Sequence, residues 1–281
     1  MTNVASASDP ISLLAQSAPE FGATVVARSA ALLEISLPVI SADGSVRTYR
    51  LALKASGATA TVSEVTASNL PGFCPERHIN LGGVFCLSWQ PIDSLDIRDV
   101  ADAEAWFEVL VRYLQMQVRA GRQRLWPGRT ARAHGDAAVH QHRAEAAAAR
   151  LGDRFDAAIR DGRLTAVAGG SGGNGRAVRV MRDGLREYAV WIRSRRPVNL
   201  RRPCVCDKTG RRIVIRDCED HAALASQLAI ELYAMQDEDA RFWRIVEGEP
   251  CCGTMDGCRL AIEPAAAADA SSTVDDKEMI I

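Results

Sequence analysis

The chain has 281 residues, a net charge of −1 and 47% hydrophobic residues. This length suits one large domain or two ordinary ones. A nearly neutral charge gives no general reason to expect nucleic acid or a membrane surface as a partner. No apolar run approaches the length of about 18 residues that predicts a membrane span, and the N-terminus lacks the basic and then apolar order of a secretory signal. We therefore expect a cytoplasmic protein.

The N-terminal third is predicted to form a helix and then an antiparallel meander. Asp9 and Pro10 are typical of an N-cap followed by a proline at the first helical position. Three stretches with period-two alternation, each predicted to be a strand, lie at 33–37, 49–54 and 59–65. Turn formers at Asp43-Gly44 and Ser56-Gly57 favour hairpin connections between them.

The segment 71–89 is predicted to be a long, ordered and functional loop. Its prolines and glycines stop strand pairing, and it contains His78, Asn80 and then Cys86 in a short apolar run. A thiolate is the nucleophile of an acyl carrier, and a side-chain amide such as that of Asn80 can donate to an oxyanion without titrating. The alternative for Cys86 is a small buried core residue.

The rest of the chain is predicted to be helical with one hairpin. The clearest helix covers 99–120 and is expected to end at Gly121, and a second helix is expected over 130–151. Further predicted elements are a flexible glycine-rich loop at 169–175, a hairpin with strands near 178–180 and 188–192, a strand at 212–216, and a helix that aligns Leu224, Leu228 and Leu232.

The eight cysteines are expected to be metal ligands, a catalytic thiol or core residues, because disulfides are rare in a reducing compartment. Cys74 is predicted to be structural. Residues of the last quarter that could supply tetrahedral zinc ligands are Cys204, Cys206, Cys218, His221, Cys251, Cys252 and Cys258. The last three could complete one site or form another. A bound zinc ion is expected to be structural, a redox cluster or core packing is the alternative, and no organic cofactor is expected.

The segment around Cys86 resembles the active-site segment of ubiquitin-conjugating (E2) enzymes. In that family a His-Pro-Asn tripeptide precedes the catalytic cysteine; here the tripeptide is His78-Ile79-Asn80, and the cysteine lies in Val84-Phe85-Cys86-Leu87. The order of helix, meander, proline-rich crossing, motif loop and helices is also similar. Ile79 replaces the family proline, and the spacing from Asn80 to Cys86 is tighter, so the resemblance is to a divergent bacterial branch.

This resemblance implies an α+β fold, with an E2-like (UBC) domain of meander and flanking helices over 1–125. A smaller α+β cysteine-rich domain that could bind zinc is expected over 126–263, followed by a disordered tail at 264–281. The resemblance also implies that Cys86 accepts a ubiquitin-like protein from an E1-like enzyme as a thioester and passes it to an amine on a target protein. Asn80 and His78 would support that chemistry, and the bacterial branch implies a role in anti-phage defence.

Two rival functions are compatible with the sequence. The first is a catalytically inactive E2-like binding module whose cysteine-rich domain reads nucleic acid through the basic run 193–202, although a solvated loop is the simpler interpretation of that run. The second is a cysteine hydrolase that uses Cys86 and His78. Such an enzyme needs a closely paired base, and a histidine on the same loop is an unconvincing one.

Overall fold

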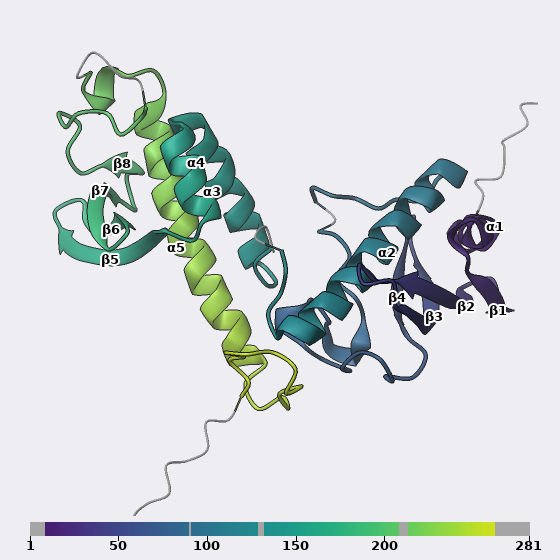
Figure 1. The fold of residues 1–281 in the computed structure, drawn as a ribbon. Helices are drawn as coiled ribbons and strands as arrows, with labels where there is room; N and C mark the ends of the chain where they lie inside the picture. The colour runs from purple at the N-terminus through teal and green to yellow at the C-terminus, as the bar shows by residue number, and fades with distance from the viewer. Residues whose placement is uncertain (1–8, 90, 129–131, 208–212, 262–281) are drawn as a thin grey trace, which may run out of the picture.

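The computed structural model describes residues 9–89, 91–128, 132–207 and 213–261. These residues form two α+β bodies, each built on a four-stranded antiparallel sheet (Figure 1). The predicted α+β class is confirmed. None of the helices within those ranges combines the length and the apolar character that a membrane span requires.

The first body contains two helices and a meander. Its elements are α1 (Pro10–Ser17), a 3₁₀ helix (Ala18–Phe21), β1 (Thr24–Arg28), β2 (Leu32–Ile40), β3 (Val46–Ser56), β4 (Thr59–Glu64) and α2 (Val100–Gln123). The strands pair antiparallel in chain order, which confirms the meander. The sequence does not predict β1, because all its residues are exposed and it lacks alternation.

One core joins the helices to the sheet. Alternate residues of β2, among them Leu33, Ile35 and Leu37, are buried together with Trp106 and Phe107 of α2. Burying a large apolar side chain is worth about 1.5–3 kcal/mol, so this face fixes the register of the strands. The predicted end of α2 at Gly121 is wrong. The helix continues to Gln123 and ends where Arg124 adopts a left-handed conformation.

The second body packs three helices with the second sheet. Its elements are α3 (Ala137–Leu151), α4 (Asp153–Arg160), β5 (Leu164–Gly172), β6 (Gly175–Arg182), β7 (Leu185–Trp191), β8 (Arg196–Pro197) and α5 (His221–Ile245). The strands are antiparallel in chain order, and the predicted hairpin is confirmed as β6–β7. The helix predicted from Leu224, Leu228 and Leu232 is confirmed as α5, in which all three are buried.

Two predictions for the second body are wrong. The glycine run 169–175 is not a flexible loop, because Ser171 and Gly172 pair with β6 and so extend β5. A Cβ on Gly169 would lie 3.1 Å from the carbonyl oxygen of Ala177, so this close approach favours glycine. The predicted strand at 212–216 is also absent over its described part, where a 3₁₀ helix (Ile215–Asp217) forms instead. The predicted tail 264–281 lies outside the described residues.

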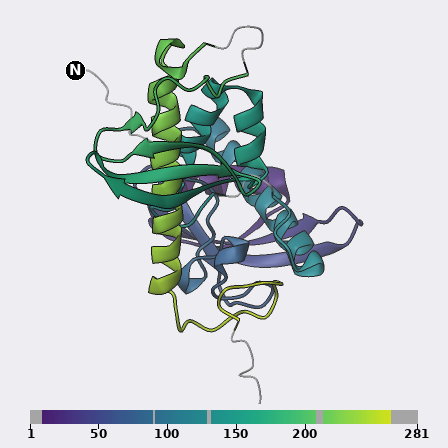
Figure 2. The ribbon, with the colours of Figure 1, turned by 90° about the vertical axis from the view of Figure 1, so that its left-hand side faces the viewer.

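The chain after α5 returns to the first body. Met255 and Cys258 are buried in the first core, and Cys251, Cys252 and Leu260 pack against it. Figures 1 and 2 show this yellow segment below α5, beside the loops of the first body. Residues 251–260 thus pack against the first body, and the domain boundary expected at 125/126 stays a prediction.

Candidate active site

The segment 71–89 is an ordered loop that positions Cys86. It contains two 3₁₀ helices, Pro75–Arg77 and Leu81–Gly83. The N–H of Cys86 donates to the carbonyl oxygen of His78 at 2.9 Å, and that of Phe85 donates to Val62 of β4 at 2.9 Å. These bonds hold the Cys86 backbone against the sheet.

The thiol of Cys86 is half-buried and faces a hollow of about 410 Å³. His78, Trp89, Tyr113 and Trp126 also line this hollow. Burial raises the pKa of the Cys86 thiol, so the protonated form dominates at neutral pH. The site therefore offers an accessible but weakly ionised sulfur.

His78 organises the loop and does not pair with the thiol. Its backbone is left-handed, with φ 54°, and its carbonyl oxygen also accepts from the Tyr113 hydroxyl at 2.9 Å. Burial, and then the charge of His134, lowers the pKa of His78 to about 4. Among the described residues, no side-chain hydrogen bond joins His78 to Cys86. The imidazole is thus neutral at pH 7 and a weak base, which disfavours the hydrolase.

Asn80 lies outside the hollow. Its side chain is exposed, its N–H donates to the carbonyl oxygen of Val84 at 2.8 Å, and its carbonyl oxygen accepts from Gly83 at 3.0 Å. The oxyanion role of its amide therefore stays a prediction. The cationic groups that do line the hollow are those of Arg112 and Arg132, neither of which has a local motif that marks it in the sequence.

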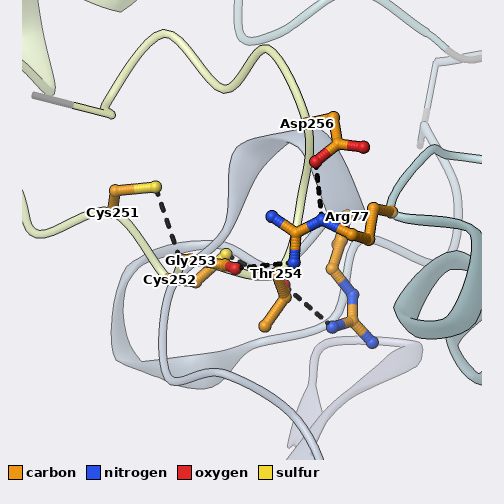
Figure 3. A network of polar contacts seen from close by, with 7 residues as sticks. Arg77, Cys251, Cys252, Gly253, Thr254 and Asp256 are labelled. Carbon is orange, nitrogen blue, oxygen red and sulfur yellow. Dashed lines mark hydrogen bonds and ion pairs between the residues drawn. The ribbon is translucent and has the colours of Figure 1, made fainter. Parts of the chain in front are cut away.

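A buried arginine joins the loop to α2 and to the C-terminal segment. Arg77 is only 4% exposed. Its guanidinium donates to the Gln117 side chain at 2.8 Å and to the Gln117 carbonyl oxygen at 3.0 Å. It also donates to the Thr254 hydroxyl at 3.1 Å (Figure 3). The Gln117 amide returns a bond to the Arg77 carbonyl oxygen at 2.6 Å, so the loop is fixed from both sides.

His134 connects the same loop to α5. One ring nitrogen lies 3.2 Å from the carbonyl oxygen of Pro75 and the other lies 3.4 Å from an Asp239 carboxylate oxygen. The ring also stacks on Phe242, with centroids 4.6 Å apart. The second body thereby contacts the loop that carries Cys86.

Four of the predicted metal ligands lie together at the N-terminus of α5. The ligand atoms of Cys204, Cys206, Cys218 and His221 lie within 4.8 Å of one another. The Cys206 and Cys218 sulfurs are 3.9 Å apart, close to the edge of about 3.8 Å expected for a tetrahedron with Zn–S bonds of about 2.3 Å. His221 Nδ1 lies 3.3 Å from Cys204 and 3.2 Å from Cys218. This donor set fits a structural zinc ion.

The other three predicted ligands lie elsewhere. Cys251, Cys252 and Cys258 pack against the first core, where the Cys252 sulfur is 3.1 Å from that of Cys74. The sequence alone does not connect Cys74 with this group, because 178 positions separate it from Cys252.

The basic run 193–202 is partly built into the second body. Arg196 belongs to β8, and the Arg202 guanidinium lies over the Tyr188 ring, 5.8 Å from its centroid. Arg195 lies 3.9 Å from Glu231 of α5. The contacts of Arg195 and Arg202 engage two of the charges that a nucleic-acid interface would need to be free.

Comparison with protein families identifies two matches along the chain. A model described as a prokaryotic E2 domain matches residues 21–128, and one described as a cysteine-rich domain C-terminal to an E2 domain matches residues 133–260. Searches of the curated proteins and of the solved structures gave no match.

Proposed function

Because the chain belongs to the bacterial E2-like proteins in which a cysteine-rich domain follows the E2 domain, we propose that it carries a ubiquitin-like protein as a thioester on Cys86. An E1-like enzyme supplies the acyl group, and an amine on a target protein receives it. The observation that carries this proposal is the Cys86 thiol, half-buried at a hollow on a loop with a fixed backbone.

The charging step is a thiol–thioester exchange, in which the acyl group moves from a sulfur of the E1-like enzyme to the sulfur of Cys86. The Cys86 thiolate attacks the carbonyl carbon of the E1-bound thioester, the new C–S bond forms, and the E1 sulfur leaves as a thiolate that takes up a proton. One C–S bond replaces another, so no strong base is needed to drive the step. This matches a site in which the neighbouring His78 has its pKa lowered to about 4 by burial and by His134.

The transfer step needs a nucleophile and a donor to the oxyanion. The target amine attacks the thioester carbon, a C–N bond forms, the C–S bond breaks and Cys86 leaves as a thiolate. Because a sulfur with a raised pKa leaves more slowly, the buried Cys86 protects its acyl group until an amine is positioned. Asn80 is proposed to donate to the oxyanion or to hold the loop.

The test is the intact mass of the protein after incubation with ATP, its E1-like enzyme and the ubiquitin-like protein, quenched without thiol. We expect an adduct with the mass of the modifier that dithiothreitol removes. Cys86→Ser should give an adduct that resists dithiothreitol, and Cys86→Ala should give none. Asn80→Ala should be charged but should transfer more slowly to an amine. An uncharged wild type beside a charged E1-like enzyme would refute the carrier function.

The bacterial branch that the motif resembles leads us to propose further that conjugation serves anti-phage defence. Cells that express the wild-type protein together with an E1-like enzyme and a ubiquitin-like protein should then resist infection, and cells with Cys86→Ala should not. Plaque counts on the two strains measure this difference, and equal counts would argue against a defence role while leaving the carrier chemistry to its own assay.

A further inference from the structure

Two cysteines from distant parts of the sequence meet where residues 251–260 pack on the E2 domain. Cys74 lies near the start of the loop that carries Cys86 and is 1% exposed, whereas Cys252 is half-buried. Their sulfurs lie 3.1 Å apart, although 178 positions separate them in the sequence. A disulfide bond is about 2.05 Å long, so a side-chain movement of about 1 Å would bring these sulfurs to bonding distance.

The surroundings of Cys252 favour its ionised form. The Thr254 hydroxyl lies 3.1 Å from the Cys252 sulfur and accepts a bond from the buried Arg77 guanidinium at 3.1 Å (Figure 3). Because Arg77 donates to the hydroxyl oxygen, the hydroxyl proton is free to point at the sulfur. Burial opposes ionisation, but the bonds from the side chain and backbone of Thr254, and then that from Cys74, lower the pKa of Cys252.

Cys74 and Cys86 are protonated at neutral pH. Burial, and then the hydrogen bond with Cys252, raises the pKa of Cys74, and burial raises that of Cys86. Thiolates are the form of cysteine that oxidants attack. Redox-sensing cysteines are in general readily ionised, accessible and next to a second thiol that resolves the oxidised sulfur. Cys252 fulfils the first two conditions, and Cys74 supplies the second thiol.

We propose that Cys252 and Cys74 form a redox pair, in which hydrogen peroxide oxidises Cys252 and Cys74 converts the product into a disulfide. In the first step the Cys252 thiolate attacks one peroxide oxygen, an S–O bond forms, the O–O bond breaks and hydroxide leaves. In the second step the Cys74 sulfur attacks the Cys252 sulfenic acid, an S–S bond forms and the S–O bond breaks. The Cys74 proton leaves with the hydroxyl group as water. The two sulfurs together lose two electrons, which the peroxide gains.

The fold selects Cys74 as the partner of Cys252 over two other nearby cysteines. Cys251 precedes Cys252 in the sequence, but its sulfur accepts a bond from the N–H of Gly253 at 3.4 Å. Cys258, which is buried in the same core, forms a hydrogen bond with Cys251. These two thiols therefore contact each other, while the Cys252 sulfur contacts that of Cys74.

A disulfide here would tie residues 251–260 to the loop of Cys86. Cys74 forms an isolated bridge with Ile79, which in turn bridges to Phe85, the residue before Cys86. The bond would therefore fix one end of this short ladder. In a reducing compartment such a disulfide is transient. The redox pair needs neither an acyl group on Cys86 nor an E1-like enzyme, so it stands or falls separately from the carrier function.

The test is peptide mapping of the full chain after reduction, removal of the reductant, treatment with hydrogen peroxide at neutral pH and alkylation of the remaining thiols. We expect a linked peptide pair that joins Cys74 to Cys252, which dithiothreitol should reverse. Cys251→Ser is the matched control and should form the same link. No such link while other thiols are oxidised, a first link from Cys252 to Cys251 or Cys258, or oxidation of Cys86 before Cys252 would each overturn the proposal.

Two single variants distinguish the roles of the two sulfurs. In Cys74→Ser, the sulfenic acid should remain on Cys252, where dimedone traps it. In Cys252→Ser, the buried and protonated Cys74 should stay reduced at the same peroxide concentration. The reverse pattern, with a dimedone adduct on Cys74 and none on Cys252, would overturn the proposed order of the steps. Circular dichroism should show that both variants remain folded.

A further pair of variants keeps both sulfurs in place and so decides the matter even if a serine variant fails to fold. Thr254→Val removes the hydroxyl next to Cys252 and should slow disulfide formation about three- to tenfold at neutral pH, because one pKa unit changes the thiolate fraction about tenfold. Thr254→Ser keeps a hydroxyl and should react at the wild-type rate. Equal rates in all three proteins would refute the activation of Cys252 by Thr254.

Discussion

At the scale of single residues, His78 connects the motif to the long helix. Few residues other than glycine adopt its left-handed backbone, and this turn lets one carbonyl oxygen accept from both Tyr113 and Cys86. His78 thus fixes the distance between Cys86 and α2 through its backbone. Its ring lies beside Trp126, with centroids 4.8 Å apart, and this packing covers part of the imidazole.

The burial of His78 predicts a pH-dependent stability. The unfolded imidazole takes up a proton near pH 6.5, whereas burial and His134 lower the folded pKa to about 4. Between these values the unfolded state binds more protons, so the free energy of unfolding rises with pH across this window. The variant His78→Asn is the reference, because asparagine does not titrate and tolerates the left-handed backbone. Relative to this variant, the free energy of unfolding of the wild type should fall by up to about 3 kcal/mol between pH 7 and pH 4.

Urea unfolding of the two proteins at several pH values measures this difference. The two proteins differ only at residue 78, so the comparison isolates the contribution of the His78 imidazole. If the difference in the free energy of unfolding between the two proteins stays constant from pH 7 to pH 4, the folded imidazole ionises normally.

At the scale of elements, the junction of α3 and α4 depends on one glycine. Gly152 ends α3 with φ 128°, and a Cβ on it would lie 2.5 Å from a carboxylate oxygen of Asp207. That carboxylate accepts a bond from the N–H of Arg154 at 2.8 Å and so stabilises the start of α4. The loop that carries Cys204 and Cys206 is thereby attached to the start of α4.

Gly152→Ala is expected to lower the free energy of unfolding by about 2–3 kcal/mol, because it adds backbone strain and displaces Asp207. Gly162→Ala is the matched control. Gly162 also has a positive φ, 69°, but no atom lies near its missing Cβ, so only the backbone cost of about 1 kcal/mol applies. Chemical denaturation of both variants tests the difference, and equal losses would contradict the role of Asp207.

The elements that the sequence predicts well are those with a strong period. The alternation in β2 and β3 reflects one buried face, and the leucines of α5 reflect one buried side. β1 could not be predicted, because an exposed edge strand pairs through its backbone and leaves no apolar pattern. The glycines of β5 were misread because their pairing with β6 is a tertiary effect that overrides local propensity.

The candidate site was predictable only where it is local. Cys86 and His78 are close in the sequence and face the same hollow, so a short motif can identify them. Trp126, Arg112 and Arg132 reach this hollow from other elements, and no period or spacing connects them to the loop. The contact of Cys74 with the C-terminal cysteines could not be predicted for the same reason. Only the return of the chain after α5 brings these residues together.

At the scale of the whole molecule, the C-terminal segment holds the loop of Cys86 in place together with α2. Arg77 donates to Gln117 of α2 and to Thr254 of the C-terminal segment. Arg124 forms an exposed ion pair with Asp256 of the same segment, at 2.5 Å. Both arginines therefore contact the same segment, one from inside the core and one from the surface.

Replacing these two arginines should have very different costs. Arg77→Met leaves the buried side-chain oxygen of Gln117 without a donor, and we expect a loss of about 3 kcal/mol in the free energy of unfolding. Arg124→Met removes a pair whose arginine is 48% exposed, and surface pairs contribute less than about 1 kcal/mol. Thermal and urea unfolding of both variants measure this contrast. If Arg77→Met lowers the free energy of unfolding no more than Arg124→Met does, Arg77 does not stabilise the loop as described.

The return of residues 251–260 to the first body affects biosynthesis. The contact between Arg77 and Thr254 spans 177 positions, so the N-terminal core is complete only after residues 251–260 have left the ribosome. Contacts between distant positions form late and slow folding. Until then, the nascent E2 domain would expose apolar surface and cysteines, which makes it a natural substrate for chaperones. Ribosomes that stop before the last cysteines would release a chain in which the loop of Cys86 lacks its contact with Thr254.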